Sequence, residues 1–138
     1  MPSRRSRPSR RRHHLLRSPC PIAGALDLLG DRWTLLVMRD LLFYDKRRYA
    51  DFLASPEGIA TNILAERLDR LERGGLIRRR RYRDRPPREE YHPTASGRDL
   101  VPVLKKLIRW GQRHVPGTAQ RPPASMKRGA APSRRSAS

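Results

Sequence analysis

Cysteine is almost absent from this chain. Cys20 is the single cysteine among 138 residues, which excludes an intramolecular disulfide, and the Cys/His spacing of a metal site is missing. No apolar run approaches the roughly 18 residues of a membrane-spanning helix. The basic N-terminus lacks the apolar segment of a secretory signal. These absences predict a cytoplasmic protein with no bound metal and no membrane partner.

The short patterns that accompany catalysis are also missing. The sequence contains no nucleophile elbow, no phosphate-binding glycine loop and no His-Glu metal motif. Glu89 and Glu90 are adjacent, and in a strand their carboxylates would point to opposite faces, so they do not form an acid–base pair. We therefore expect neither an enzyme nor a cofactor.

Acidic residues are few beside the basic ones. Lys and Arg number 32 and Asp and Glu 13, so the formal net charge is +19. Such a balance favours a polyanionic partner, above all nucleic acid. Residues 1–19 and 116–138 carry twelve basic residues, no acid and few apolar side chains, which leaves a net charge of +7 on residues 20–115. We predict two disordered basic tails around one domain over residues 20–115.

The clearest helical pattern lies in residues 58–75. Leu64, Leu68 and Leu71 recur at i, i+4 and i+7 and form one apolar stripe, while the opposite face is polar. Glycines at both ends are typical start and stop signals. A short helix is expected at 49–54, joined to the next one by a tight turn. This arrangement is typical of a helix-turn-helix, whose second helix enters the major groove of DNA.

A β-hairpin is predicted directly after this helix. Its strands are expected at about 76–83 and 88–91, because the adjacent prolines Pro86 and Pro87 interrupt regular structure between them. A helix-turn-helix followed by such a hairpin is a winged helix. The expected fold class is therefore mainly α with a small β-hairpin.

Three further helices are expected around this motif. Residues 21–29 and 32–42 precede it, and the second is apolar on most sides, which is typical of a buried helix. One long helix is expected at 95–114. Trp33 and Trp110 are expected in the core.

The order and spacing of several stretches resemble the HxlR family, a branch of the winged helix-turn-helix transcription factors. The matching stretches are Cys20-Pro21, Leu29–Leu42, Pro56–Ile59, Glu66–Ile77, Pro86–Tyr91, Thr94–Leu104 and Trp110-Gly111. The resemblance covers residues 20–115 and implies a homodimeric repressor that binds double-stranded DNA and is associated with the nucleoid when bound.

Two positions depart from the family pattern. Ala60 stands where a Ser usually caps the recognition helix, and the lost acceptor costs roughly 1 kcal/mol. Pro93 stands where a strand leucine is usual, so the second strand is expected to end early.

Base contacts are predicted near the start of the recognition helix. Thr61, Asn62 and Glu66 lie there, and Asn can read adenine while Glu can accept from cytosine. Arg67 occupies a position that is usually Arg in the family and either contacts DNA or braces the helix. Arg70 is a further candidate contact. Alternatively, Glu66 and Arg70 pair with each other at i,i+4 spacing.

Phosphate contacts are predicted on the wing. Arg78 and Arg80 belong to a basic run that alternates across a strand, and Arg85 and Arg88 flank the tip. The alternative is a solvated charged face. A different class of function, a non-specific RNA-binding or nucleoid-coating protein, also fits the charge. Aromatic residues for stacking on single strands are few, at 6%, which favours duplex DNA.

The flanking helices are predicted to form the dimer interface, as the family resemblance also implies. The apolar stripe of the last helix is long for a small core, although packing within one chain is the alternative. The expected interface residues are Ile22, Leu26, Leu100, Leu104, Leu107 and Ile108. A symmetric dimer would read a pseudo-palindromic site.

Cys20 is a candidate thiol sensor. It precedes a helix beginning at Pro21 and lies close in sequence to Arg17, and both features raise thiol reactivity. Several HxlR-type proteins use such a cysteine to sense electrophiles or oxidants, so the resemblance implies a small effector of that kind. The alternative is a cysteine that fills a gap at the dimer interface.

Overall fold

The chain divides into two units, with the boundary after Arg32. Helix α2 (Pro21–Leu29) belongs to the first unit. The computed structural model describes residues 17–119, so the predicted disorder of residues 1–16 and 120–138 lies outside them. Proline at the first helical position is favourable because its missing N–H has no intrahelical partner there. The helix has the predicted bounds, and Arg17 pairs with Asp27 at 2.6 Å.

Helix α3 (Thr34–Phe43) forms the centre of the second unit, whose described part is residues 33–119. Val37, Met38 and Leu41 are buried, and the helix packs against α5, β2 and α7. It begins two residues later than predicted, with Trp33 at the cap position. Trp33, which is expected in the core, is only half-buried. The apolar character of this segment therefore predicts its central position correctly.

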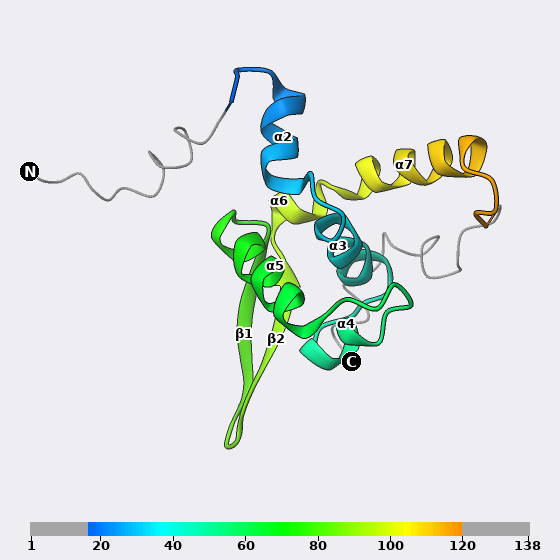
Figure 1. The fold of residues 1–138 in the computed structure, drawn as a ribbon. Coiled ribbons are helices and arrows are strands. Elements are labelled where there is room, and N and C mark those ends of the chain that lie inside the picture. Colours follow the sequence, from blue (N-terminus) through cyan, green and yellow to red (C-terminus); the bar gives the residue numbers. More distant parts are fainter. Residues whose placement is uncertain (1–16, 120–138) are drawn as a thin grey trace, which may run out of the picture. The chain divides into compact units, whose positions relative to one another are not determined.

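Helices α4 (Tyr49–Leu53) and α5 (Thr61–Arg73) form the helix-turn-helix (Figure 1). The predicted stripe of α5 is confirmed, since its three leucines are all buried. Ala60 occupies the cap position of α5, and no side-chain hydrogen bond caps the helix there. The departure noted in the sequence therefore leaves the first turn of α5 without a local side-chain acceptor.

Strands β1 (Ile77–Asp84) and β2 (Pro87–Pro93) form the wing, an antiparallel hairpin that extends beyond α4 and α5 to a narrow tip (Figure 1). Strand β1 has the predicted length and begins one residue later, whereas β2 is longer than predicted, and the expectation that Pro93 ends β2 early is wrong. Pro93 pairs with Ile77 at the end of a two-stranded sheet, where the missing proline N–H is tolerated.

The single helix expected at 95–114 is two helices, α6 (Ala95–Arg98) and α7 (Val101–His114). Pro102 lies in the first turn of α7, where its missing N–H is harmless, so the helix starts anew there. In α6, Gly97 lies so close to the carbonyl oxygen of Leu76 that a Cβ would collide with it. The prediction that Trp110 is buried is also wrong, since this residue is 59% exposed.

The uncapped start of α5 leads to a test of stability. We expect Ala60→Thr to raise the free energy of unfolding by about 1 kcal/mol, because the hydroxyl can accept from an N–H of the first turn. The backbone at Ala60 is already extended, with φ −72° and ψ 150°, as a cap residue requires. Ala60→Val has nearly the same shape without the acceptor. Equal gains for both variants in chemical denaturation without DNA would contradict the explanation.

Candidate nucleic-acid interface

The first turn of α5 presents small polar side chains to solvent. Thr61 and Asn62 are both exposed, as their place at the start of the helix predicts. The hydroxyl of Tyr49 in α4 donates a 2.6 Å hydrogen bond to the carbonyl oxygen of Thr61. This bond ties the start of α5 to the preceding helix, close to the residues predicted to meet base edges.

Glu66 is engaged within α5 itself. Its carboxylate accepts hydrogen bonds from Arg67 and, at 3.4 Å, from Arg70. The alternative of intrahelical pairing is therefore present in the structure. The side chain of Arg67 is only 17% exposed, which places it against the protein, as a bracing role requires.

The two faces of the wing have different surroundings. Arg79 donates to Glu72 of α5 at 3.0 Å, and its guanidinium lies 5.6 Å from the ring centre of Tyr91. Burial raises the pKa of Tyr91. Because side chains alternate along a strand, the predicted contacts Arg78 and Arg80 lie on the face directed away from α5.

Arg48, just before α4, links the helix-turn-helix to this outer wing face. Its guanidinium lies 4.7 Å from the ring centre of Tyr82 in β1, and its Nε is 3.8 Å from the carboxylate of Glu90 in β2. His92 shares that carboxylate at 3.1 Å, yet burial lowers its pKa from the ordinary value. The outer face therefore carries arginine charge while His92 is predominantly neutral at pH 7.

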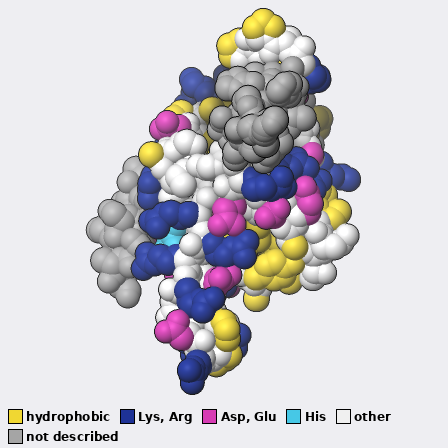
Figure 2. Space-filling model, turned by 90° about the vertical axis from the view of Figure 1, so that its left-hand side faces the viewer, with side chains coloured by type: hydrophobic (Ala, Val, Ile, Leu, Met, Phe, Trp, Pro, Cys, Tyr) yellow, Lys and Arg dark blue, Asp and Glu magenta, His cyan; other side chains and the backbone are white. Residues whose placement is uncertain are grey.

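The tip of the wing is basic and accessible. Arg85 and Arg88 are exposed, and Arg88 lies opposite Arg83 in the register of the two strands. Figure 2 shows Lys and Arg side chains recurring over one face and down onto the projecting wing, with Asp and Glu side chains among them. The arrangement presents cations at the tip, where a phosphate backbone could approach.

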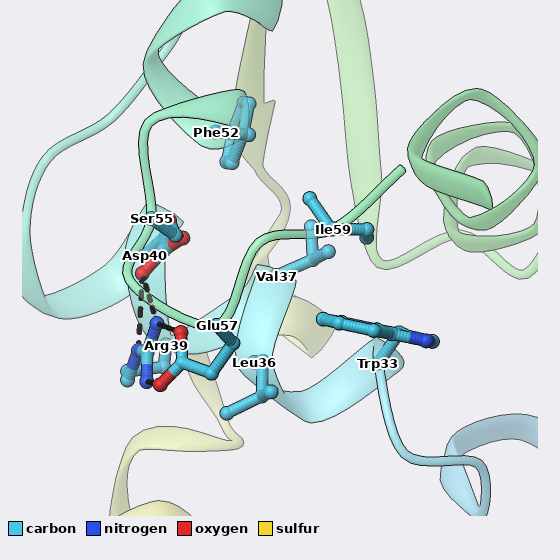
Figure 3. A pocket seen from close by; sticks show the side chains of 9 residues that line it. All are labelled: Trp33, Leu36, Val37, Arg39, Asp40, Phe52, Ser55, Glu57 and Ile59. Carbon is cyan, nitrogen blue, oxygen red and sulfur yellow. Dashed lines mark hydrogen bonds and ion pairs between the residues drawn. The ribbon is translucent and has the colours of Figure 1, made fainter. Parts of the chain in front are cut away.

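A buried polar cluster, missed in the sequence, lies behind the turn that leads into α5 (Figure 3). Asp40 of α3 is 3% exposed and accepts a hydrogen bond from the hydroxyl of Ser55. The ammonium group of Lys46 donates to the same hydroxyl at 2.9 Å and lies 3.7 Å from Asp40. The sequence signal for this cluster is an acidic residue inside a largely apolar helix, because a carboxylate that is buried there needs polar partners.

The neighbouring residue of α3, Arg39, reaches the same turn. Its two terminal nitrogens each donate to Glu57 at 2.8 Å (Figure 3). This pairing lowers the pKa of Glu57 and raises that of Arg39. Both groups are therefore charged throughout the neutral range, and the turn is joined to α3 by a bidentate ion pair.

The residues predicted at the dimer interface have different environments. Leu104 is buried within its own unit, Leu100 and Ile108 are half-buried, and Leu107 is 51% exposed. An apolar groove of about 230 Å³ runs between α3 and α7. It is lined by Leu35, Leu36, Arg39, Phe43, Leu104, Leu107 and Ile108.

The first unit contributes the other predicted residues. Ile22 and Leu26 of α2 are exposed, and Cys20 is exposed at the cap position of that helix. Cys20 has an extended backbone, and its N–H donates to the hydroxyl of Ser18 at 3.2 Å. Its thiol is therefore accessible in the unit to which it belongs.

Residues 17–119 contain neither a metal-binding cluster nor a membrane-spanning helix. No group of three or more His, Cys, Asp or Glu side chains there could hold a metal ion. Within the same residues, no helix has both the length and the apolar character needed to cross a membrane.

Known proteins with similar sequences are transcriptional regulators. The chain is 42% identical over 92 residues to the uncharacterized HTH-type transcriptional regulator sll1512 of Synechocystis, a match that covers 67% of each protein. It is 40% identical over 95 residues to the uncharacterized HTH-type transcriptional regulator Rv3095 of Mycobacterium tuberculosis, covering 69% of this chain and 59% of that protein. The chain thus spans about three fifths to two thirds of the length of these relatives.

Solved structures extend the similarity to the fold. PA1607, a candidate transcription factor, matches with a TM-score of 0.66 and 34% identity, covering 75% of this chain and 72% of that one. The oxidized form of the redox regulator HypR matches with a TM-score of 0.62 and 29% identity, and the match covers 69% of this chain and 97% of HypR. The reduced form of the transcriptional regulator YodB from Bacillus subtilis matches with a TM-score of 0.59 and 26% identity, and the match covers 74% of this chain and 100% of YodB.

These matches confirm the winged helix-turn-helix fold and the resemblance seen in the sequence. The HxlR-like helix-turn-helix family model matches residues 28–119, a span that includes the helix-turn-helix, the wing and α7. The chain belongs to the HxlR-like helix-turn-helix family of transcriptional regulators.

Proposed function

We propose that this protein is a sequence-specific, DNA-binding transcriptional repressor that acts as a homodimer. The observation that carries the proposal is the exposed first turn of α5, with Thr61 and Asn62, beside a wing whose tip carries Arg85 and Arg88. The family membership supports DNA as the partner, which would bring the protein to the nucleoid in the cytoplasm. A non-specific nucleoid-coating protein is the outcome to expect if no DNA sequence is preferred.

The contacts divide into two tasks. Arginine at the wing attracts phosphates of any sequence and releases counterions, which makes binding depend on salt. Asn62 can form paired hydrogen bonds with an adenine edge, which other bases do not offer. Since Glu66 is bonded to Arg67 and Arg70, it would have to leave these partners to accept from cytosine. Thr61 and Asn62 are therefore the better candidates for base reading.

An exposed apolar stripe on α7 supports the homodimer. Val103, Leu107 and Trp110 recur at i, i+4 and i+7, and each is at least half exposed. Such a stripe loses contact with water only when another surface covers it. A symmetric partner would place two α5 helices about one DNA turn apart, which matches a pseudo-palindromic site.

Regulation through Cys20 is the third element of the proposal. The thiol is exposed, and HypR, a structural relative, is a redox regulator. A small electrophile or oxidant that modifies the thiol would change the surface at the start of α2. The expected consequence is a change in DNA affinity that depends on this one side chain.

The division of tasks is tested with a duplex enriched from a random pool by the wild-type protein, here called the enriched duplex. We expect Asn62→Ala to weaken binding to this duplex by roughly 1–3 kcal/mol and to leave a random duplex unaffected. Arg85→Ala should weaken both duplexes and lower the salt slope by about one. Fluorescence anisotropy over a salt series measures both effects. Equal losses on both duplexes for Asn62→Ala would contradict base reading.

The dimer is tested by Leu107→Glu, which places a charge in the exposed stripe. We expect the mass measured by light scattering to fall from that of a dimer to that of a monomer, because a buried unpaired carboxylate is unfavourable. Lys105→Glu adds an acid to the same helix outside the stripe and should leave the mass unchanged. A wild-type protein that is monomeric with and without DNA would overturn the homodimer.

The thiol response is tested with diamide. We expect the oxidant to change the affinity of the wild type for the enriched duplex at least several-fold, and to leave Cys20→Ser unchanged, because the hydroxyl does not react. Anisotropy before and after reduction with dithiothreitol separates thiol chemistry from damage. Identical responses of the two proteins would remove the sensor role.

A further inference from the structure

We propose that Arg39 and Glu57 are positioning residues that hold α5 at the distance and angle needed to read bases. The inference rests on the proposed function, because it assigns these residues to the same recognition helix. Neither side chain needs to touch DNA. Their role is to join the turn before α5 to α3, the most buried helix of the second unit.

The start of α5 has little local support. Ala60 provides no side-chain cap, and the turn before it contains Gly58 with φ +71°, a conformation that only glycine adopts readily. The position of the first turn must therefore come from contacts with other elements. Ile59 supplies one such contact, since its side chain is buried beside α3.

The ion pair supplies a directional contact. Two parallel N–H···O bonds of 2.8 Å fix both the distance and the orientation of Glu57 relative to the guanidinium (Figure 3). The side chain of Arg39 is mostly buried and also donates to Asp40 at 3.0 Å. Arg39 is thus bonded both to Asp40 within α3 and to Glu57 in the turn.

Further contacts join the turn to α3. Trp33, Val37, Ile59 and the ion pair line a small, partly open pocket of about 10 Å³, roughly the volume that a single water requires. Ser55 is fixed at the other end of the turn by Asp40 and Lys46. Residues on both sides of Gly58 therefore contact α3, and α5 begins at Thr61, two residues after Ile59.

Base reading and phosphate attraction respond differently to a displaced helix. Hydrogen bonds to base edges weaken steeply when distance or angle departs from the optimum. Attraction between arginines and phosphates falls only gradually with distance. Loss of the Arg39–Glu57 pair should therefore reduce selectivity for the enriched duplex and largely preserve affinity for random DNA.

The test variant is Glu57→Gln, which keeps the side-chain shape and removes a negative charge. Electrostatics alone predicts tighter binding to both duplexes. Positioning predicts that the ratio of affinities, enriched over random, falls by about tenfold or more, within the range of one lost base contact. The matched control is Asp69→Asn, which makes the same charge change on an exposed residue of α5 that pairs within the helix, with Arg73 at 3.1 Å.

A second variant, Arg39→Lys, keeps the charge beside Asp40 and removes the bidentate geometry. We expect a similar fall in the affinity ratio, and no further fall when both substitutions are combined, because each breaks the same contact. Circular dichroism and melting of each variant, measured before titration, restrict the comparison to folded protein.

The outcomes separate the two levels of the proposal. A wild type that enriches no duplex would overturn the proposed function together with the positioning role. A selective wild type whose ratio is unchanged in Glu57→Gln and Arg39→Lys would overturn the positioning role alone. If the affinity ratio fell equally in Glu57→Gln and Asp69→Asn, the positioning role would also be overturned, because the change of charge would then be the cause.

Discussion

The architecture around the recognition helix depends on one buried carboxylate. Asp40 lies in the middle of α3, where an unpaired charge would be strongly unfavourable. Its partners Ser55, Lys46 and Arg39 come from the turn before α5, the loop before α4 and α3 itself. Satisfying this group therefore brings the helix-turn-helix and the core helix together in one arrangement. The apolar stripe of α5 supplies burial, whereas the carboxylate supplies a specific geometry.

Periodicity predicts those elements whose structure is decided locally. The α5 stripe and the bounds of α2 follow directly from spacing and from Pro21. Periodicity does not reveal the break between α6 and α7, where a new helix start places Pro102 in the first turn and its missing N–H is harmless. The length of β2 was underestimated for a related reason. At the end of an edge strand no partner needs the N–H group that proline lacks. The sequence does not show that β2 has such an edge position.

The candidate site was only partly predictable. Exposure of Thr61 and Asn62 follows from their position at the start of an amphipathic helix. Alternation divides the basic run of β1 into two faces, but only the structure shows which face meets α5, where Arg79 contacts Glu72. The pairing of Arg39 with Glu57 joins residues 18 positions apart. No local pattern indicates such a pair, because it forms only when the turn has folded onto α3.

Under the proposed function, the distribution of charge limits how this protein can distinguish DNA sequences. A net charge of +19 attracts every duplex alike, so selectivity has to come from groups whose interaction depends on geometry. Along α5 much of the charge is paired, with Arg70 on Glu66 and Arg73 on Asp69. Paired charges hold side chains in place and add little net attraction. Under the proposed function, the uncharged and exposed Thr61 and Asn62 are then the groups of the first turn best able to discriminate, and the accuracy of their placement matters more than the number of cations around them.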